Sequence, residues 1–166
     1  MGMGMPCAMT TSIPTLALGE DDIIFKCTPN NNNYIWLDSV WLSFMGANAR
    51  DLNQSGIIEF VEFSTNPTGG NVGTVRLFEG GDDIAGLSQW QSIPSGGWST
   101  AGVEAGTRIG QMPFNIAYGF HWSAKRAGKS LLISEAWTGF GVIFRGPPGF
   151  PSMKMDAGCT WREMKT

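Results

Sequence analysis

The sequence is poor in charge and has no long apolar segment, and each shortage excludes a class of protein. Charged residues make up 15% of its 166 residues, compared with about 25% in an average soluble domain. Hydrophobic residues at 42% exclude an intrinsically disordered chain, which combines low hydrophobicity with high net charge. Glycine, proline, asparagine and serine interrupt the uncharged runs well before the length of a membrane-spanning helix. The sequence therefore predicts a folded domain without membrane insertion.

Basic residues are also scarce. Eleven lysines and arginines stand against fourteen aspartates and glutamates, which gives a formal net charge of -3. Proteins that bind phosphate backbones present a basic surface. We therefore do not expect nucleic acid as a partner.

The residue sets that carry enzyme chemistry are missing as well. His121 is the only histidine, and no serine, cysteine or aspartate motif accompanies it to form a triad. The sequence contains no GxSxG elbow and no P-loop, and no GxGxxG precedes a helical pattern. We interpret His121 as a surface or interface residue, and we predict a protein that is not an enzyme and binds no cofactor.

Cysteine is rare and odd in number. Cys7, Cys27 and Cys159 allow at most one intrachain disulfide, and their spacing does not match a zinc site. We interpret Cys27 as a small buried hydrophobic residue and the two cysteines near the termini as incidental. No metal site is expected.

Turn-forming residues are abundant, since 23 glycines and 9 prolines make up about a fifth of the chain. Between them lie short runs of β-branched and aromatic residues at intervals of about 8–12 residues, the pattern of a β-sandwich or β-barrel. The region 84–112 is weakly patterned, and we predict a long excursion with one short strand there. The predicted strands are 23–28, 34–45, 56–64, 72–78, 115–123, 130–137 and 139–145.

Two of these strands differ in their alternation. In 115–123, Ile116, Tyr118, Phe120 and Trp122 occupy alternate positions, which predicts one apolar face and a fixed register. In 34–45 both faces contain apolar residues, whereas a sheet with one solvated face shows cleaner alternation. We infer that one outer face is covered by the terminal segments or by a neighbouring subunit.

The two ends of the chain differ from the middle. Residues 1–20 are rich in Met, Gly, Pro and Thr, and no Lys or Arg precedes Lys26, so the segment does not match an export signal. Near the other end, 146–151 contains three prolines, which cannot continue a central strand. We therefore expect an N-terminal arm (1–20), a β-sandwich domain (21–146) and a C-terminal tail (147–166).

The order of several segments resembles a known family. The segments are 34–42, 57–63, the Thr-Gly-Gly turn and strand of 68–77, the Gly-Lys-Ser-Leu strand entry of 127–133, and 141–144. Together they resemble the small jelly-roll structural proteins of tailed phages and related environmental sequences, over roughly residues 30–145. The resemblance implies an all-β, antiparallel β-sandwich of jelly-roll type with extended N- and C-terminal arms.

The resemblance also implies a structural subunit that self-assembles into a virion component or an extracellular filament. In such an assembly an arm can add a strand to a neighbour's sheet edge, and residues 13–18 are the candidate donor strand. Other virion proteins are possible further partners. The candidate subunit-interface residues are Ile13, Leu16, Leu18, Trp41, Phe150 and Trp161.

A different class of function stays open. Aromatic side chains stack on sugars, and the sequence contains seven tryptophans. Trp90 and Trp98 fall outside the predicted strands, so they are the candidate platform of a module that binds carbohydrate or another surface. Surface glycans are therefore an alternative partner to a second copy of the chain.

Overall fold

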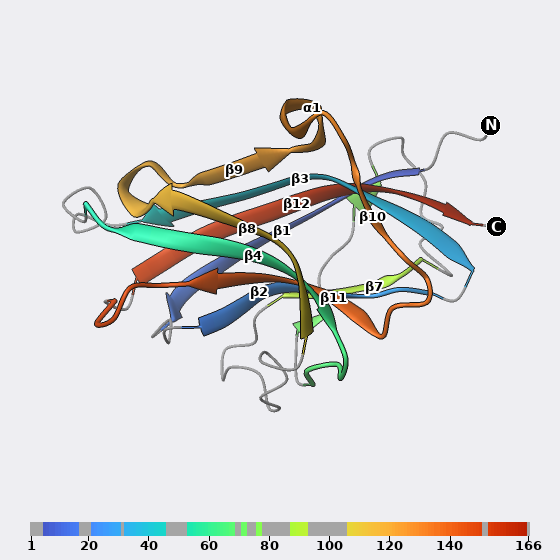
Figure 1. Ribbon diagram of the computed structural model, residues 1–166, viewed down its shortest axis with the longest axis horizontal. Helices are drawn as coiled ribbons and strands as arrows, with labels where there is room; N and C mark the ends of the chain where they lie inside the picture. The colour runs from blue at the N-terminus through green and yellow to red at the C-terminus, as the bar shows by residue number, and fades with distance from the viewer. Residues whose placement is uncertain are drawn as a thin grey trace.

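The computed structural model consists almost entirely of β-strands (Figure 1). The structure describes residues 5–16, 21–30, 32–45, 53–68, 71–72, 76–77, 87–92, 106–150 and 153–165. The strands are β1 (Met5–Leu16), β2 (Asp21–Thr28), β3 (Asn33–Met45), β4 (Ser55–Phe63), β5 (Asn71–Val72), β6 (Arg76–Leu77), β7 (Gln89–Ser92), β8 (Gly106–Asn115), β9 (Phe120–Ser123), β10 (Leu131–Ile133), β11 (Gly139–Arg145) and β12 (Met153–Lys165), and the one α-helical turn in the described residues is α1 (Ala124–Ala127).

The strands form two antiparallel sheets. Sheet A has the order β10-β3-β12-β1-β6, and β9 also pairs with β3. Sheet B has the order β5-β7-β2-β11-β4-β8. Buried side chains of both sheets belong to one hydrophobic cluster, so the two sheets pack face to face as a sandwich.

The order in which the chain visits the two sheets defines a jelly roll. β9 pairs with residues 39–42 of β3 and β10 with residues 35–37, so the two are halves of one interrupted strand. With that strand counted once, β1, β3, β9/β10 and β12 lie in sheet A, and β2, β4, β8 and β11 lie in sheet B. Within each sheet the orders β1-β12-β3-β9/β10 and β2-β11-β4-β8 are those of two interlocked Greek keys. The predicted all-β, antiparallel β-sandwich of jelly-roll type is confirmed.

Within the terminal segments, Met5–Leu16 and Met153–Lys165 are strands of sheet A, and this corrects the expectation of an extended arm and tail there. β12 lies between β3 and β1, and β1 pairs with it from Met5 opposite Glu163 to Leu16 opposite Met153. Along β12 the buried residues alternate, as expected for a strand with one face on the core: Met153, Met155, Ala157, Cys159, Trp161 and Glu163. Pro147 and Pro148 therefore lie in a turn before this strand, closed by the hydrogen bond from Phe150 N–H to the Pro147 carbonyl.

The four strand predictions 23–28, 34–45, 56–64 and 139–145 agree with β2, β3, β4 and β11. The prediction of one strand over 115–123 is wrong. The chain forms a 3-10 turn at Ile116–Tyr118, where the Asn115 side chain accepts a hydrogen bond from the backbone N–H of Ala117. Gly119 then adopts φ 71°, and a Cβ added there would lie 2.6 Å from the Leu42 carbonyl oxygen, so the position favours glycine. Tyr118 is consequently 89% exposed.

A β-bulge in β3 explains its mixed alternation. Trp161 pairs with Leu37 and Thr160 with Ser39, so Asp38 is an extra residue in the ladder. Each bulge reverses the side on which the following residues lie. The inward, buried residues of β3 are therefore Ile35 and Leu37 before the bulge, and Val40, Leu42 and Phe44 after it.

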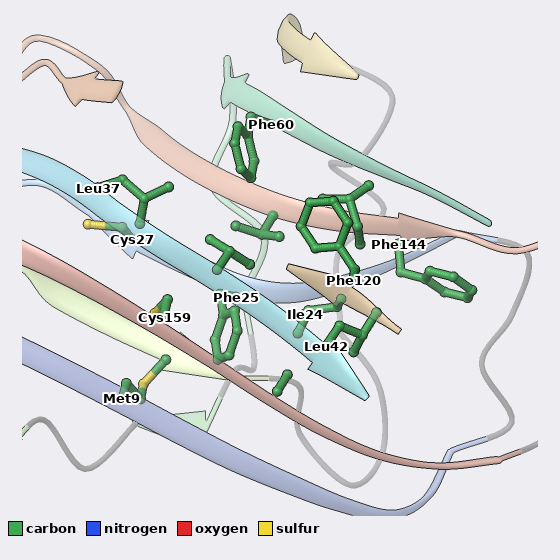
Figure 2. Packing of buried hydrophobic residues seen from close by; sticks show 14 of the residues in the cluster. Met9, Ile24, Phe25, Cys27, Leu37, Leu42, Phe60, Phe120, Phe144 and Cys159 are labelled. Carbon is green, nitrogen blue, oxygen red and sulfur yellow. The ribbon is translucent and has the colours of Figure 1, made fainter. Parts of the chain in front are cut away.

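The core fills the space between the sheets. Figure 2 shows side chains from both sheets in this space: Met9, Cys159 and Leu37 come from sheet A, and Phe25 and Phe60 come from sheet B. All of these side chains are at most 4% exposed. Burial of this kind is the main favourable contribution to folding.

All three cysteines belong to this core and are free thiols. Burial, followed by the nearby Glu163 carboxylate, raises the pKa of Cys7 to about 12. Burial also raises the pKa of Cys27 and of Cys159. Cys7 and Cys159 are therefore core residues like Cys27 rather than incidental ones, and a protonated, buried thiol is chemically inert.

Candidate interaction surface

The predicted interface residues are scattered over the structure. Ile13 and Leu16 lie in β1, opposite Met155 and Met153 of β12. Leu18 and Trp98 lie outside the described residues. Of the predicted interface residues with a described side chain, only Trp41 is part of an accessible face.

Phe150 lies in the core, which contradicts its prediction as an interface residue of an extended tail. Its backbone N–H donates to the Pro147 carbonyl at 3.0 Å, and Gly149 adopts φ 73°. This turn directs the ring inward, 5.3 Å from the Phe144 ring and 5.5 Å from the Phe44 ring. Only 9% of Phe150 is exposed.

Trp90 and Trp161 stack on each other in the interior. Their ring centroids are 4.3 Å apart with an interplanar angle of 26°, and each residue is 1% exposed. Trp90 belongs to β7 and Trp161 to β12, so neither lies in a loop or tail. Trp90 is not an open ligand platform, and Trp161 is not accessible to a neighbouring subunit.

A buried carboxylate lies at the end of this aromatic pair. Glu163 is 0% exposed, and its Oε1 accepts hydrogen bonds from Asn33 Nδ2 at 2.5 Å, Ser88 N at 2.6 Å and Ser88 Oγ at 2.7 Å. Its Oε2 accepts from Trp161 Nε1 at 3.3 Å. Neutral donors from β3, β12 and the segment before β7 therefore satisfy this group, which links the ends of the two sheets.

The outer face of sheet A carries an aromatic cluster, which we call the Trp36 patch. Trp36 lies between Leu132 of β10 and Arg162 of β12, and Tyr34 lies opposite Met164. The Tyr34 and Trp36 rings are 6.0 Å apart. Tyr34 is 38% and Leu132 45% exposed, and Trp36 and Met164 are half-buried. The patch thus joins three neighbouring strands.

Arg162 is fixed beside this patch by Asp38. Arg162 Nε and Nη2 each donate to the Asp38 carboxylate at 2.9 Å, and Nη2 also donates to Ser130 Oγ at 3.3 Å. The hydrogen bonds to Asp38 raise the pKa of Arg162. The bulge of β3 supplies Asp38 at this position, so the pair depends on that irregularity of the strand.

Trp41 covers a different part of the same face. Its ring lies on Gly158 of β12, where an added Cβ would come within 2.5 Å of the indole. His121 of β9 lies opposite Trp41 and is exposed, as expected for a surface or interface residue. The face therefore contains two tryptophans, each on a β-ladder position next to β12.

The described residues contain no group of three or more His, Cys, Asp or Glu side chains that could hold a metal ion. Within the same residues, no helix has the length and apolar character to cross a membrane. The outer face of sheet A offers aromatic and aliphatic surface beside a fixed arginine.

Comparisons with known proteins give structural neighbours only. No protein-family model and no curated protein sequence matches the chain. A chain from the structure of the Gx strain of infectious bursal disease virus is 10% identical with a TM-score of 0.28, and the alignment covers 96% of this chain and 32% of that chain. A chain from a single-particle structure of maize chlorotic mottle virus is 12% identical with a TM-score of 0.29, and the alignment covers 98% and 95%. The jelly-roll assignment rests on the strand order and not on these neighbours.

Proposed function

We propose that the protein is a non-enzymatic structural subunit that assembles with copies of itself, in a virion or in an extracellular filament. A jelly roll occurs in capsid proteins and in lectins, so the fold alone does not decide the function. The observation that carries the proposal is the Trp36 patch on the outer face of sheet A.

The composition of the patch is typical of a protein interface. Tyrosine, tryptophan, methionine and arginine are enriched at interface cores, and Trp, Tyr and Arg dominate interface binding energy. The patch contains one residue of each of these four types beside Leu132. Extended apolar patches on a protein surface mark interaction sites, and this patch joins exposed apolar side chains of two neighbouring strands.

The patch is also held in place before binding. It lies on paired strands, and the two-pronged contact of Arg162 with Asp38 fixes the arginine beside Trp36. A preorganised surface loses little conformational entropy on association. A second copy of the chain is the proposed occupant, with sheet A of one subunit stacked on its neighbour.

The proposal includes exchange of the N-terminal strand between subunits, as a swap of β1 rather than as the addition of a free arm. β1 already lies between β12 and β6 of its own chain. Donation would require β1 to leave this place and to occupy the equivalent place in a neighbour, which is a domain swap. Ile13 and Leu16 would then contribute to the subunit contact through the pairing that they make with β12.

The test replaces the two most exposed apolar residues of the patch with lysine. We expect the wild-type protein to form oligomers or filaments in size-exclusion chromatography with light scattering and in negative-stain micrographs. Tyr34→Lys combined with Leu132→Lys should give monomers with an unchanged circular dichroism spectrum. Tyr118→Lys is the matched control, because Tyr118 is exposed but lies outside the patch.

The outcomes separate the candidate functions. A wild-type protein that stays monomeric at high concentration, or a double variant that assembles like the wild type, would overturn the proposal. Binding on a glycan array that is lost in Trp98→Ala while the oligomeric state is retained would instead support the carbohydrate-binding alternative.

A further inference from the structure

A pocket of about 260 Å³ lies at one edge of the sandwich and is lined by residues of both sheets. It lies between β8, the edge of sheet B, and β9 and β10, which form the edge of sheet A. These elements and α1, coloured yellow to orange, lie together in Figure 1. The floor is apolar and consists of Phe60, Met112, Trp122 and Leu131.

The pocket results from the interruption of the strand β9/β10. After β9 the chain leaves the sheet and returns at β10, with Ser123 capping α1 through its Oγ and Gly128 ending it at φ 73°. Trp122 lies opposite Val40 and Leu131 opposite Leu37 on the inward side of the sheet. Trp122 and Leu131 nevertheless stay partly exposed, and both line the pocket.

The shape and size of the pocket limit its ligand. Its volume is below the range of about 300–1,000 Å³ that is usual for drug-sized ligands, so a single ring with a short side chain fits it. The Phe60 and Trp122 rings meet edge to face, 5.2 Å apart at 83°. They provide aromatic surface on which an apolar body gains contact energy without losing hydrogen bonds to water.

The rim of the pocket has one charge. Lys129 lies there beside Gln111 and Ser130, and none of the lining residues is acidic. In the described part of the chain no carboxylate forms an ion pair with Lys129. An ammonium group at the mouth of an apolar pocket favours a ligand with an anionic end.

We propose that this pocket binds a compact carboxylate with an aromatic or branched aliphatic body, the body on Trp122 and the carboxylate at Lys129. The test is an NMR titration of the protein with 3-phenylpropionate and with its neutral amide, following the seven tryptophan indole N–H signals. The Trp122 signal is assigned from its absence in Trp122→Phe. The acid should shift this signal saturably at millimolar concentration, and the amide should bind about fivefold more weakly.

Lysine substitutions test the role assigned to Lys129. Lys129→Gln should weaken binding of the acid about fivefold and abolish the preference over the amide. Lys125→Gln is the matched control: Lys125 is also exposed but does not line the pocket, only the neighbouring depression, so this variant should leave both affinities unchanged. Neither variant should change the oligomeric state, which keeps this test separate from that of the proposed function.

Two results would overturn the inference. One is a Trp122 signal that does not move with either compound. The other is an equal affinity of the wild type and of Lys129→Gln for the acid, when thermal denaturation shows that both proteins are folded.

Discussion

The outer faces of the two sheets differ in what covers them. On sheet B four outward apolar residues form a second buried cluster, 0–3% exposed: Ile23, Val61, Phe63 and Ile143. On sheet A the corresponding face leaves Tyr34 and Leu132 more than a third exposed. One face is thus closed within the chain, and the other is available to a partner.

The chain itself helps to close the face of sheet B. After β4 it turns back, and Lys26 Nζ donates to the Pro67 carbonyl at 2.6 Å while Asn66 Nδ2 donates to the Thr138 carbonyl at 2.5 Å. Burial lowers the pKa of Lys26. These contacts hold Asn66 and Pro67 against Thr138, which precedes β11, and against Lys26 of β2.

The ion pairs on the two faces differ in how far they are buried. On sheet B the Glu59 carboxylate is 1% exposed, with Arg145 Nε 2.5 Å from Oε2 and Arg108 Nη2 2.8 Å from Oε1. On sheet A the pair of Arg162 and Asp38 is 46% and 30% exposed. Removing a buried partner costs several times more free energy than breaking a solvated pair, so the difference can be measured.

The largest contrast is expected between two alanine substitutions. Ile143→Ala on sheet B should lower the free energy of unfolding by about 2–5 kcal/mol, because it leaves a cavity in a closed cluster. Leu132→Ala on sheet A should change it by less than about 0.5 kcal/mol. Urea denaturation of both variants is the measurement. Equal losses would show that the face of sheet B is not closed in solution.

Glu59→Gln should lower the free energy of unfolding by about 1–3 kcal/mol, because two arginines lose a charged acceptor on the closed face. Glu62→Gln is the control on the same strand, where the side chain is half-buried on the opposite face. A loss no larger than that of the control would contradict the closed environment of Glu59.

The free energy of unfolding at alkaline pH tests the burial of Cys7 in the core between the two faces. The thiol of Cys7 has a pKa of 9.0 as its reference value and about 12 in the fold, so its stabilising contribution is complete below pH 9 and is lost between pH 9 and 12. At pH 10 the loss is on the order of 1 kcal/mol for one thiol. Denaturation at pH 8 and pH 10 measures it, and Cys7→Ala should show a correspondingly smaller drop.

On the open face, Gly158→Ala should cost about 1 kcal/mol. The new Cβ would come within 2.5 Å of the Trp41 indole, but this ring is only half-buried and can move toward solvent. A shift in tryptophan emission should accompany the change. Gly110→Ala is the control, because its Cβ would meet Phe60 at an ordinary 3.9 Å.

The smallest effect is expected for Asp38→Asn, about 0.5 kcal/mol in the free energy of unfolding, since the pair with Arg162 is solvated. The effect should shrink further at 1 M salt, where exposed charges are screened. A loss above 2 kcal/mol would show that the open face is more enclosed than that of a free subunit.

Much of the fold follows from local pattern. The strands β2, β3, β4 and β11 are visible in the sequence because apolar and turn residues mark them. Apolar and polar residues alternate in parts of β12 as well, but this strand follows a Gly- and Pro-rich segment that resembles the end of a domain. Only pairing with β3 and β1, more than a hundred residues earlier, reveals it as a central strand.

The interaction surface was harder to predict for a related reason. Period-two counting assigns Trp36 and Val40 to one face, but the bulge at Asp38 places Trp36 outside and Val40 inside. The same counting leaves Trp90 and Trp161 outside the strands, whereas they stack in the core. A single extra residue changes the face of every side chain that follows, and no local signal in this sequence announces it.

The sequence by itself determined the class of molecule: an all-β sandwich rich in turns, with a weak negative charge and one histidine. Those properties depend on composition and short-range periodicity, which act residue by residue. The tertiary structure decided that both ends of the chain pair in one sheet, that one outer face is closed and the other open, and that a pocket lies beneath the interrupted strand. Each of these depends on contacts between residues far apart in the chain, whose geometry is set by bulges, turns and packing rather than by local preference.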